Sequence, residues 1–458
     1  MRLLRAPAFL CALGAVSMAV ALQLSSGMFD PAALALAALT SALAIAAVVL
    51  PAQLPSAPRA GPDASAVQVL LGAGFLHGIW CHVFLVPTFY ADPRRMGGFR
   101  GLALLSLLVG SAYLCVHLRA SLQRLRLLGF LACFLAMGAI IIHLSNGPRI
   151  DVWLFQQIGA DALKQGYNPY SVSYPDLYAR TGETLKMYGP EIVRDHRVHV
   201  YPYPPLTALL AVPSFALLGD VRYVNLAAMA IAGFAIARLG GAAGEVAALF
   251  LLFQGRSFFV LEQGWSEAVV LAAFAVSVLI ASRPARRLPQ WLALGLSLGV
   301  LAASKQYSPL LLLPLALALP ARLRPRAALV ALAFVLITFA PFVVWDAEGL
   351  YRGVVKMQFL QPLRTDSLSL LALWARSHGA PAWGAVPAFA AAAGVLALAA
   401  ARRFTLAHAC TAAAAAWLVL VLLNKQAFCN YDWLGIGLLC VAIAAHADAD
   451  RQVREQTA

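Results

Sequence analysis

Apolar stretches, separated by short polar connectors, follow one another along almost the whole chain. About 20 helical residues cross a hydrocarbon layer about 30 Å thick, so stretches near this length predict transmembrane helices. They are much longer than barrel strands, and a helix satisfies its own backbone hydrogen bonds in lipid. We therefore expect an all-α polytopic membrane protein with about 14 to 15 transmembrane helices. The candidate segments are 7–24, 31–50, 65–87, 101–118, 126–144, 203–218, 221–239, 243–259, 266–282, 288–303, 307–319, 327–345, 383–400, 405–423 and 431–446.

Composition and charge support this class. The chain is 62% hydrophobic and 12% charged, with a mean hydropathy of +0.78, so a soluble core could not bury its apolar surface. Its net charge of +14 would suit nucleic acid, but the basic residues lie in short connectors, so no nucleic-acid partner is expected. By the positive-inside rule they mark cytoplasmic turns, and the segments 145–200 and 346–382 then face the outer side. The clusters are Arg119, Arg124 and Arg126; Arg283, Arg286 and Arg287; Arg322, Arg324 and Arg326; and Arg402 and Arg403.

The positions of the basic residues do not fit a chain in which every candidate segment crosses the membrane in turn. Four crossings between 203 and 282 would place the basic residues at 282–287 on the outer side, so one candidate there is expected not to cross. The cluster Arg94, Arg95 and Arg100 falls on the outer side and is an exception to the rule.

The first apolar stretch resembles a secretory signal, but a second stretch follows at once without a small-x-small cleavage site. It is expected to be a retained anchor.

Several kinds of chemistry have no sequence support. The cysteines form no CxxC pair, their number is odd, and most lie in apolar stretches, which argues against a zinc site and a disulfide framework. Neither a GxGxxG turn nor a P-loop is present. The triplet Asp448-Ala-Asp450 resembles a metal-binding DxD but lies in a charged C-terminal tail. We expect no metal site and no cofactor.

The segment 145–200 is the longest polar stretch, and it is rich in aromatic residues. A stripe of apolar residues between 152 and 165 predicts a helix lying on the membrane surface, ended by Gly166 and the Asn168-Pro169 turn. Asp151 at its start has two interpretations, a helix cap or a general base facing water. The residues of the stripe are Phe155, Ile158, Ala162 and Leu163.

The stretch VHVYPYPPLTALLAVP begins with Val198 and His199 and places Tyr201 and Tyr203 among prolines. Prolines and aromatic rings are typical of a stiff helix start at a membrane interface. The same residues could instead form a rigid aromatic wall beside a site.

Polar side chains also occur beside or between the apolar stretches at the inferred outer side. A charge at the bilayer centre costs roughly 2.5 to 3.5 kcal/mol, so such residues are functional or paired. Pairing of Lys305 with Glu262 or Glu267 is the structural alternative. The residues are Arg256, Glu262, Gln263, Glu267, Lys305, Arg364, Asp366, Lys425 and Asn430.

These motifs occur in a familiar order: an Asp at the start of a loop, then GYNPY, YPYPPLTALLAVP, a Lys before SPLLLLP, and NKQAFCNYDW. The order resembles the GT-C superfamily of integral-membrane glycosyltransferases. The resemblance is closest to bacterial polyprenyl-phosphate-sugar-dependent mannosyltransferases, including the phosphatidylinositol-mannoside type, and is more distant to the eukaryotic GPI mannosyltransferase I family. It covers 123–446 as the catalytic membrane domain. An extra region of four helices precedes it at 1–122, and a cytoplasmic tail follows at 447–458.

The resemblance implies a GT-C-like helical bundle in the cell (inner) membrane, with a large first luminal or periplasmic loop. It implies transfer of a sugar, mannose by this likeness, from a polyprenyl-phosphate donor to a hydroxyl of a cell-envelope glycolipid or glycan at the outer face, with inversion. Asp151 would be the base, and His196 or His199 would move protons or bind the acceptor. Many relatives carry a second acidic residue beside this Asp; here Arg149-Ile-Asp-Val has none, so a metal-independent mechanism is expected. The implied substrate-binding residues are Tyr170, His199, Tyr201, Tyr203, Arg256, Glu262, Gln263, Lys305, Arg364 and Lys425.

Other function classes remain as alternatives. A transporter or lipid flippase also uses many helices and intramembrane charges, but commonly shows inverted repeats, which this sequence lacks. An envelope glycan polymerase or ligase would share the topology with different loops, and a noncatalytic scaffold would not need polar groups along one side.

Overall fold

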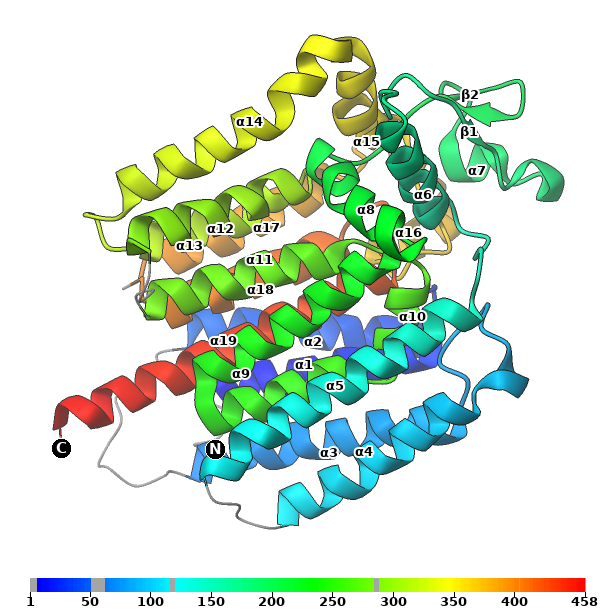
Figure 1. Ribbon diagram of the computed structural model, residues 1–458. Helices are drawn as coiled ribbons and strands as arrows, with labels where there is room; N and C mark the ends of the chain where they lie inside the picture. Colours follow the sequence, from blue (N-terminus) through cyan, green and yellow to red (C-terminus); the bar gives the residue numbers. More distant parts are fainter. Residues whose placement is uncertain (1–5, 51–61, 116–119, 284–287, 403, 458) are drawn as a thin grey trace.

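Apolar helices lie side by side and form most of the structure (Figure 1). The computed structural model describes residues 6–50, 62–115, 120–283, 288–402 and 404–457. Within these residues, seven helical segments are long and apolar enough to cross a membrane, and seven shorter apolar helices accompany them. The predicted all-α polytopic membrane class is confirmed, whereas the GT-C likeness stays a prediction.

The long segments are α1 (Pro7–Ser25), α2 (Pro31–Val49), α3 (Pro62–Phe84), α5 (Ala120–Leu144), α9 (Arg222–Phe253), α14 (Arg324–Tyr351) with its continuation η4 (Arg352–Lys356) and α15 (Met357–Leu360), and α19 (Cys429–Thr457). The shorter ones are α4 (Gly97–Cys115), α8 (Pro205–Leu218), α11 (Glu267–Ser282), α12 (Gln290–Ser304), α13 (Ser308–Ala318), α17 (Val386–Ala400) and α18 (Leu406–Leu422).

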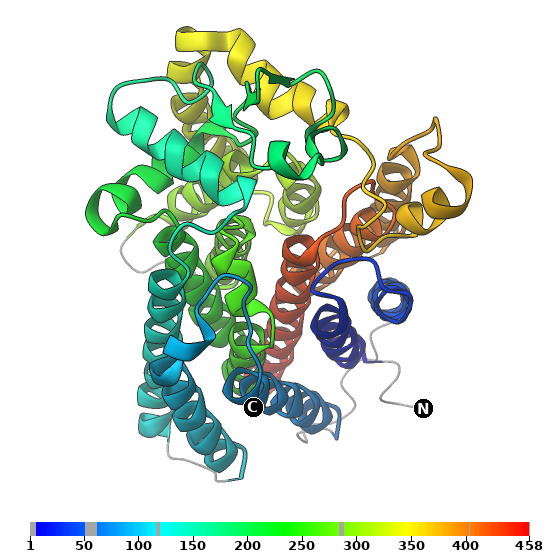
Figure 2. The same ribbon diagram turned by 90° about the vertical axis from the view of Figure 1, so that its right-hand side faces the viewer.

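The two ends of the bundle differ. One end, here called the α6 end, carries α6 (Asp151–Lys164), α7 (Thr184–Tyr188), α10 (Ser257–Glu262), α16 (Leu370–His378) and a small sheet, and Figure 2 looks onto it. The opposite end holds the last residues of α19 (Figure 1). There the carboxylate of Asp448 bonds to Ser282, Arg283 and Arg451, so it holds this part of α19 against the residues at 282–283.

The middle of α19 forms the centre of the bundle. Its residues from Trp433 to Ala445 are almost entirely buried and pack against α1, α9 and α18. By contrast, most of α14 is exposed, and its outward residues Leu329, Ile337 and Val344 are apolar. An apolar exterior is expected of a helix whose surroundings are lipid tails rather than water.

Helix α9 is a hairpin of two helices rather than one rod. Gly241 has φ 60° and ψ −133°, a backbone conformation that breaks the helix and suits glycine. After this turn the chain folds back, so that a Cβ on Gly233 would lie 2.7 Å from the Leu252 side chain. The two candidate segments 221–239 and 243–259 are therefore antiparallel neighbours, although the second helix already ends at Phe253.

Helix α8 does not run the length of the bundle, because both of its ends lie at the α6 end. Before its start, the carbonyl of Tyr203 accepts a hydrogen bond from Tyr170. After its end, the carbonyl of Gly219 accepts one from Gln157 of α6. The candidate segment 203–218 thus begins and ends at the same end of the bundle, and without it the remaining segments between 203 and 282 alternate as the basic residues require.

The basic connectors lie at the opposite end where the structure describes them. Arg126 pairs with Glu245 beside the α9 turn at 2.6 Å, and Arg283 pairs with Asp448 at 3.3 Å. Arg119, Arg286, Arg287 and Arg403 lie outside the described residues. Arg94 and Arg95 form a short 3-10 turn at the α6 end, so they remain an exception to the charge rule.

The segment 145–200 has a small core of its own, in which Phe155, Tyr174 and Tyr188 pack with the following Tyr201 against residues of α14 and η4. It includes a feature that the sequence analysis missed, a three-stranded antiparallel sheet with the order β1-β3-β2. The strands are β1 (Tyr174–Pro175), β2 (Val193–Arg194) and β3 (Arg197–Val198). Asp195 and His196, both with positive φ, turn the hairpin between β2 and β3 and leave His196 exposed at its tip.

Candidate active site

Asp151 is the first residue of α6, and the residue that caps this helix is Ile150. The helix-cap interpretation of Asp151 is therefore wrong: its carboxylate accepts a hydrogen bond only from the N–H of the next residue, Val152, at 2.8 Å, whereas a cap bonds to N–H groups further into the first turn. Asp151 is half-buried and forms no ion pair within the described part of the chain. Burial raises the pKa of Asp151 above its ordinary value, although the Val152 N–H, Tyr188 and Arg364 each favour the ionised form.

Tyrosine side chains surround Asp151. Burial raises the pKa of Tyr188, Tyr178, Tyr90 and Tyr203, and the charge of Asp151 raises each of them further, which shows that all four lie within its electrostatic reach. The Tyr188 hydroxyl also stabilises the charged form of Asp151, but among the described residues it has no hydrogen bond of normal geometry.

Tyr90 comes from the connector between α3 and α4, within the extra N-terminal region. Its hydroxyl donates to the carbonyl of Arg149 at 2.9 Å, directly before α6. The connector is held by Glu262, whose carboxylate accepts hydrogen bonds from the backbone N–H groups of Phe89, Tyr90 and Ala91 at 2.7, 2.9 and 2.9 Å. The first four helices thus contribute a side chain to the surroundings of Asp151.

A group of charges forms the second side of the site. Arg364 and Asp366 form a two-pronged ion pair, with both N–O distances 2.8 Å, and Lys186 lies 3.3 Å from the same carboxylate. Burial alone would raise the pKa of Asp366, but the bonds and charge of Arg364, and then those of Lys186, outweigh it and lower that pKa. Two cations therefore contact one carboxylate beside Asp151, and Lys186 also lies 3.5 Å from the exposed Glu183.

Lys305 and Glu267 form a buried ion pair at 3.0 Å, with exposed side-chain fractions of 9% and 0%. The pairing of Lys305 with Glu267, one of the two partners considered from sequence, is confirmed. The Tyr307 hydroxyl donates to the same Glu267 oxygen at 3.1 Å, while the other oxygen has no partner among the described residues. The Lys305 ammonium lies 4.9 Å from the centre of the Tyr203 ring, so Tyr203 stands between this pair and Asp151.

Tyr170 and Tyr201 are packed behind Tyr203. Both are buried, their rings are 5.4 Å apart, and the Tyr170 hydroxyl donates to the Tyr203 carbonyl at 2.6 Å. The predicted aromatic wall is present, but the rings of Tyr170 and Tyr201 are covered by protein and are not placed to stack on a sugar. His199 faces a separate cavity beside η4.

Four other predicted substrate residues hold the backbone in place. Glu262 and its neighbour Gln263 secure the 89–91 connector, with 3.2 Å between their side chains. Arg256 reaches the carbonyls of Leu22 and Gln23 at the end of α1. Lys425 donates to the carbonyls of Gln361 and Phe359 at 2.6 and 3.3 Å, and burial lowers its pKa. Each is occupied by structural contacts.

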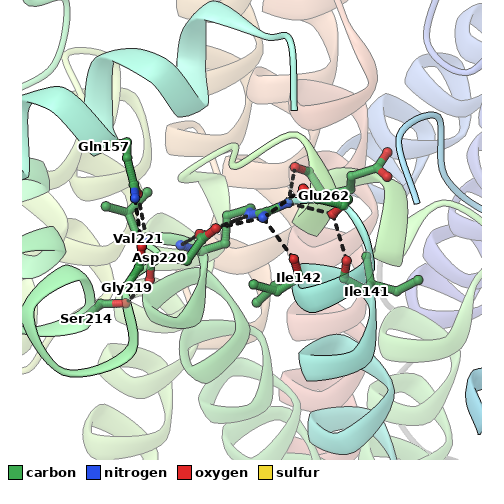
Figure 3. A network of polar contacts seen from close by, with 10 residues as sticks. Ile141, Ile142, Gln157, Ser214, Gly219, Asp220, Val221 and Glu262 are labelled. Atoms are coloured by element: carbon green, nitrogen blue, oxygen red, sulfur yellow. Dashed lines mark hydrogen bonds and ion pairs between the residues drawn. The ribbon is translucent and has the colours of Figure 1, made fainter. Parts of the chain in front are cut away.

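Arg222 was not singled out from sequence, yet it connects three elements close to the start of α6. Figure 3 shows its partners Asp220, Ile142 and Glu262. Its side chain is fully buried and pairs with Asp220 at 2.7 Å. It also donates to Ser145 and to the carbonyls of Ile142 and Glu262 at 2.8, 3.1 and 3.2 Å. One guanidinium thus joins the end of α5, the end of α10 and the turn from α8 to α9.

No group of three or more His, Cys, Asp or Glu side chains that could hold a metal ion is found in the described ranges. No family model, curated protein or solved structure matches this chain. Its function must therefore be argued from the site itself.

Proposed function

We propose that the protein is a membrane glycosyltransferase that moves a sugar from a polyprenyl-phosphate donor to an acceptor hydroxyl at the α6 end. The observation that carries the proposal is Asp151, a half-buried carboxylate at one end of an apolar bundle, with a raised pKa and no ion pair to any residue that the structure describes. A general base needs a pKa nearer to neutral pH than that of a free Asp, together with access to its proton donor.

In the proposed reaction, the acceptor oxygen attacks the anomeric carbon while Asp151 takes the hydroxyl proton. The bond between the anomeric carbon and the phosphate oxygen breaks, and polyprenyl phosphate leaves with the electron pair. The sugar is inverted in this single displacement. Arg364, Lys186 and Lys305 would stabilise the negative charge that develops on the phosphate, since preorganised cations stabilise such charge strongly.

The side of the membrane and the sugar belong to the same proposal. The basic connectors at the opposite end favour a cytoplasmic location for that end, so the α6 end faces the outer side of the cell membrane. Mannose, and an envelope glycolipid or glycan as acceptor, are proposed from the resemblance described above.

The experiment uses the purified full-length protein with polyprenyl phosphomannose and a panel of envelope glycolipids. We expect polyprenyl phosphate to be released only when a suitable acceptor is present, which chromatography of the lipid products would measure. Release that does not depend on any acceptor, or no release with the whole panel, would contradict the proposed reaction.

Asp366→Asn is expected to shift the acidic limb of the pH–rate profile to lower pH. The substitution removes the carboxylate that balances Arg364, whose charge already lowers the pKa of Asp151. A stronger positive field lowers that pKa further, so Asp151 stays ionised at more acidic pH. Glu183→Gln is the matched control, because it removes a carboxylate that pairs with Lys186 at 3.5 Å on the exposed surface. An unchanged limb in Asp366→Asn would show that Arg364 does not act on the base.

A further inference from the structure

A polar cavity of ≈ 140 Å³ lies beside η4, between the segment 170–200 and the end of α14. It is lined by side chains that include Ser171, Glu191, Arg194, His199 and Arg352. One water takes about 30 Å³ in the liquid, so the cavity has room for a group several times larger. It is distinct from the surroundings of Asp151, because none of the tyrosines Tyr90, Tyr178, Tyr188 and Tyr203 lines it.

The basic side chains of this cavity have unused donors. The Nε of Arg352 is buried and has no hydrogen-bond partner within the described part of the chain. The protein therefore does not hold the Arg352 side chain through this nitrogen, although Arg352 lines the cavity. Arg194 and His199 likewise make no side-chain hydrogen bond to another described residue. Three donor groups from η4, β2 and the residue after β3 thus surround one space.

The acidic groups nearby are already occupied. Glu191 lines the cavity but is largely exposed and lies 3.8 Å from Lys356. Asp346, which accepts a hydrogen bond from Ser171 at 2.8 Å, also accepts one from the N–H of Gly349. Among the charged side chains that line the cavity, Arg194 and Arg352 face the single carboxylate of Glu191, so the lining carries an excess of positive charge.

We propose that this cavity binds a phosphate group. A planar carboxylate is satisfied by a single two-pronged guanidinium, whereas a phosphate offers several oxygens in different directions to donors from separate elements. The phosphate could be free in solution or belong to a lipid headgroup, since both present the same oxygens. The proposal concerns binding alone and does not depend on glycosyl transfer.

The test titrates inorganic phosphate into the full-length protein in nanodiscs of digalactosyl diacylglycerol, a bilayer lipid without phosphate, with binding measured by calorimetry and acetate as the comparison anion. We expect saturable binding of phosphate that is stronger than that of acetate. Arg352→Ala and Arg194→Ala should each weaken it by about tenfold or more, because each removes charge-assisted hydrogen bonds. Arg194 is exposed, so its replacement is not expected to disturb folding.

Arg180→Ala is the matched control, because Arg180 is exposed in the same segment but does not line the cavity. Adding phosphatidic acid to the nanodiscs separates the two sources: weaker binding of inorganic phosphate identifies a lipid headgroup as a competitor, and unchanged binding identifies a soluble phosphate. The proposal is overturned if wild type shows no saturable binding, if acetate binds as well as phosphate, or if Arg180→Ala weakens binding as much as the cavity variants do.

Discussion

Asp151→Asn is expected to lower the rate of sugar transfer by at least about a hundredfold, which is the usual effect of losing a general base. Asn keeps the size of the side chain and can still accept the hydrogen bond from the Val152 N–H, so α6 should begin at the same place. It cannot take up the proton of the acceptor hydroxyl. Initial rates with saturating donor and acceptor would measure the effect.

The same variant is expected to unfold at an equal or higher temperature than wild type. The folded-state pKa of Asp151 is raised, so the group stabilises the fold below its unfolded-state pKa, and this contribution is lost as the pH rises through the folded-state value. At neutral pH the ionised Asp151 therefore costs stability, and Asn removes that cost. A loss of activity accompanied by a lower unfolding temperature would point to a structural role instead.

Arg222→Ala is expected to destabilise the folded protein by about 3 to 5 kcal/mol, which is typical when one partner of a buried ion pair is removed. The substitution leaves Asp220 without its cation and leaves the carbonyls of Ile142 and Glu262 without a donor. Because Ser145 and Ile142 end α5 just before Asp151, activity should fall as well. Thermal unfolding and hydrogen exchange at residues 142–151 would measure the two effects.

Arg126→Ala is the matched control, since it breaks a similarly buried pair, Arg126–Glu245, at the opposite end of the bundle. It should reduce stability without increasing hydrogen exchange at 142–151. The double variant Arg222→Met with Asp220→Asn should recover part of the lost stability, because an apolar side chain leaves no unpaired charge. Equal exchange in Arg222→Ala and Arg126→Ala would contradict the positioning role of Arg222.

Most helix positions could be predicted from sequence, because apolar stretches bounded by proline and polar residues leave few other choices in a membrane. The candidate segments 7–24 and 31–50, for example, correspond to Pro7–Ser25 and Pro31–Val49. The orientation of α8 could not be predicted, because an apolar stretch may cross a membrane or pack between other helices. Only the contacts of Tyr203 with Tyr170 and of Gly219 with Gln157 place both of its ends at one end of the bundle.

The candidate site was predicted in part. Asp151, Tyr203, Lys305 and Arg364 lie near one another although they are distant in sequence. Tyr90 and Lys186 were missed, because nothing in a polar connector reveals which partner from another connector it meets. Glu262 and Arg256 were predicted to bind substrate, yet both bond to backbone groups. The cost of placing a charge in a membrane does not show whether its partner is a substrate or a backbone group.

The most direct test of the proposed function follows the sugar itself in proteoliposomes that contain the purified protein, a polyprenyl phosphate donor labelled in its sugar, and a glycolipid acceptor. The proposed mechanism predicts that the label enters a new glycosidic bond of inverted anomeric configuration, with one polyprenyl phosphate released for each sugar transferred, and that Asp151→Asn does neither. Movement of the intact donor across the bilayer, with the label still bound to phosphate, would contradict the mechanism and identify the protein as a lipid transporter.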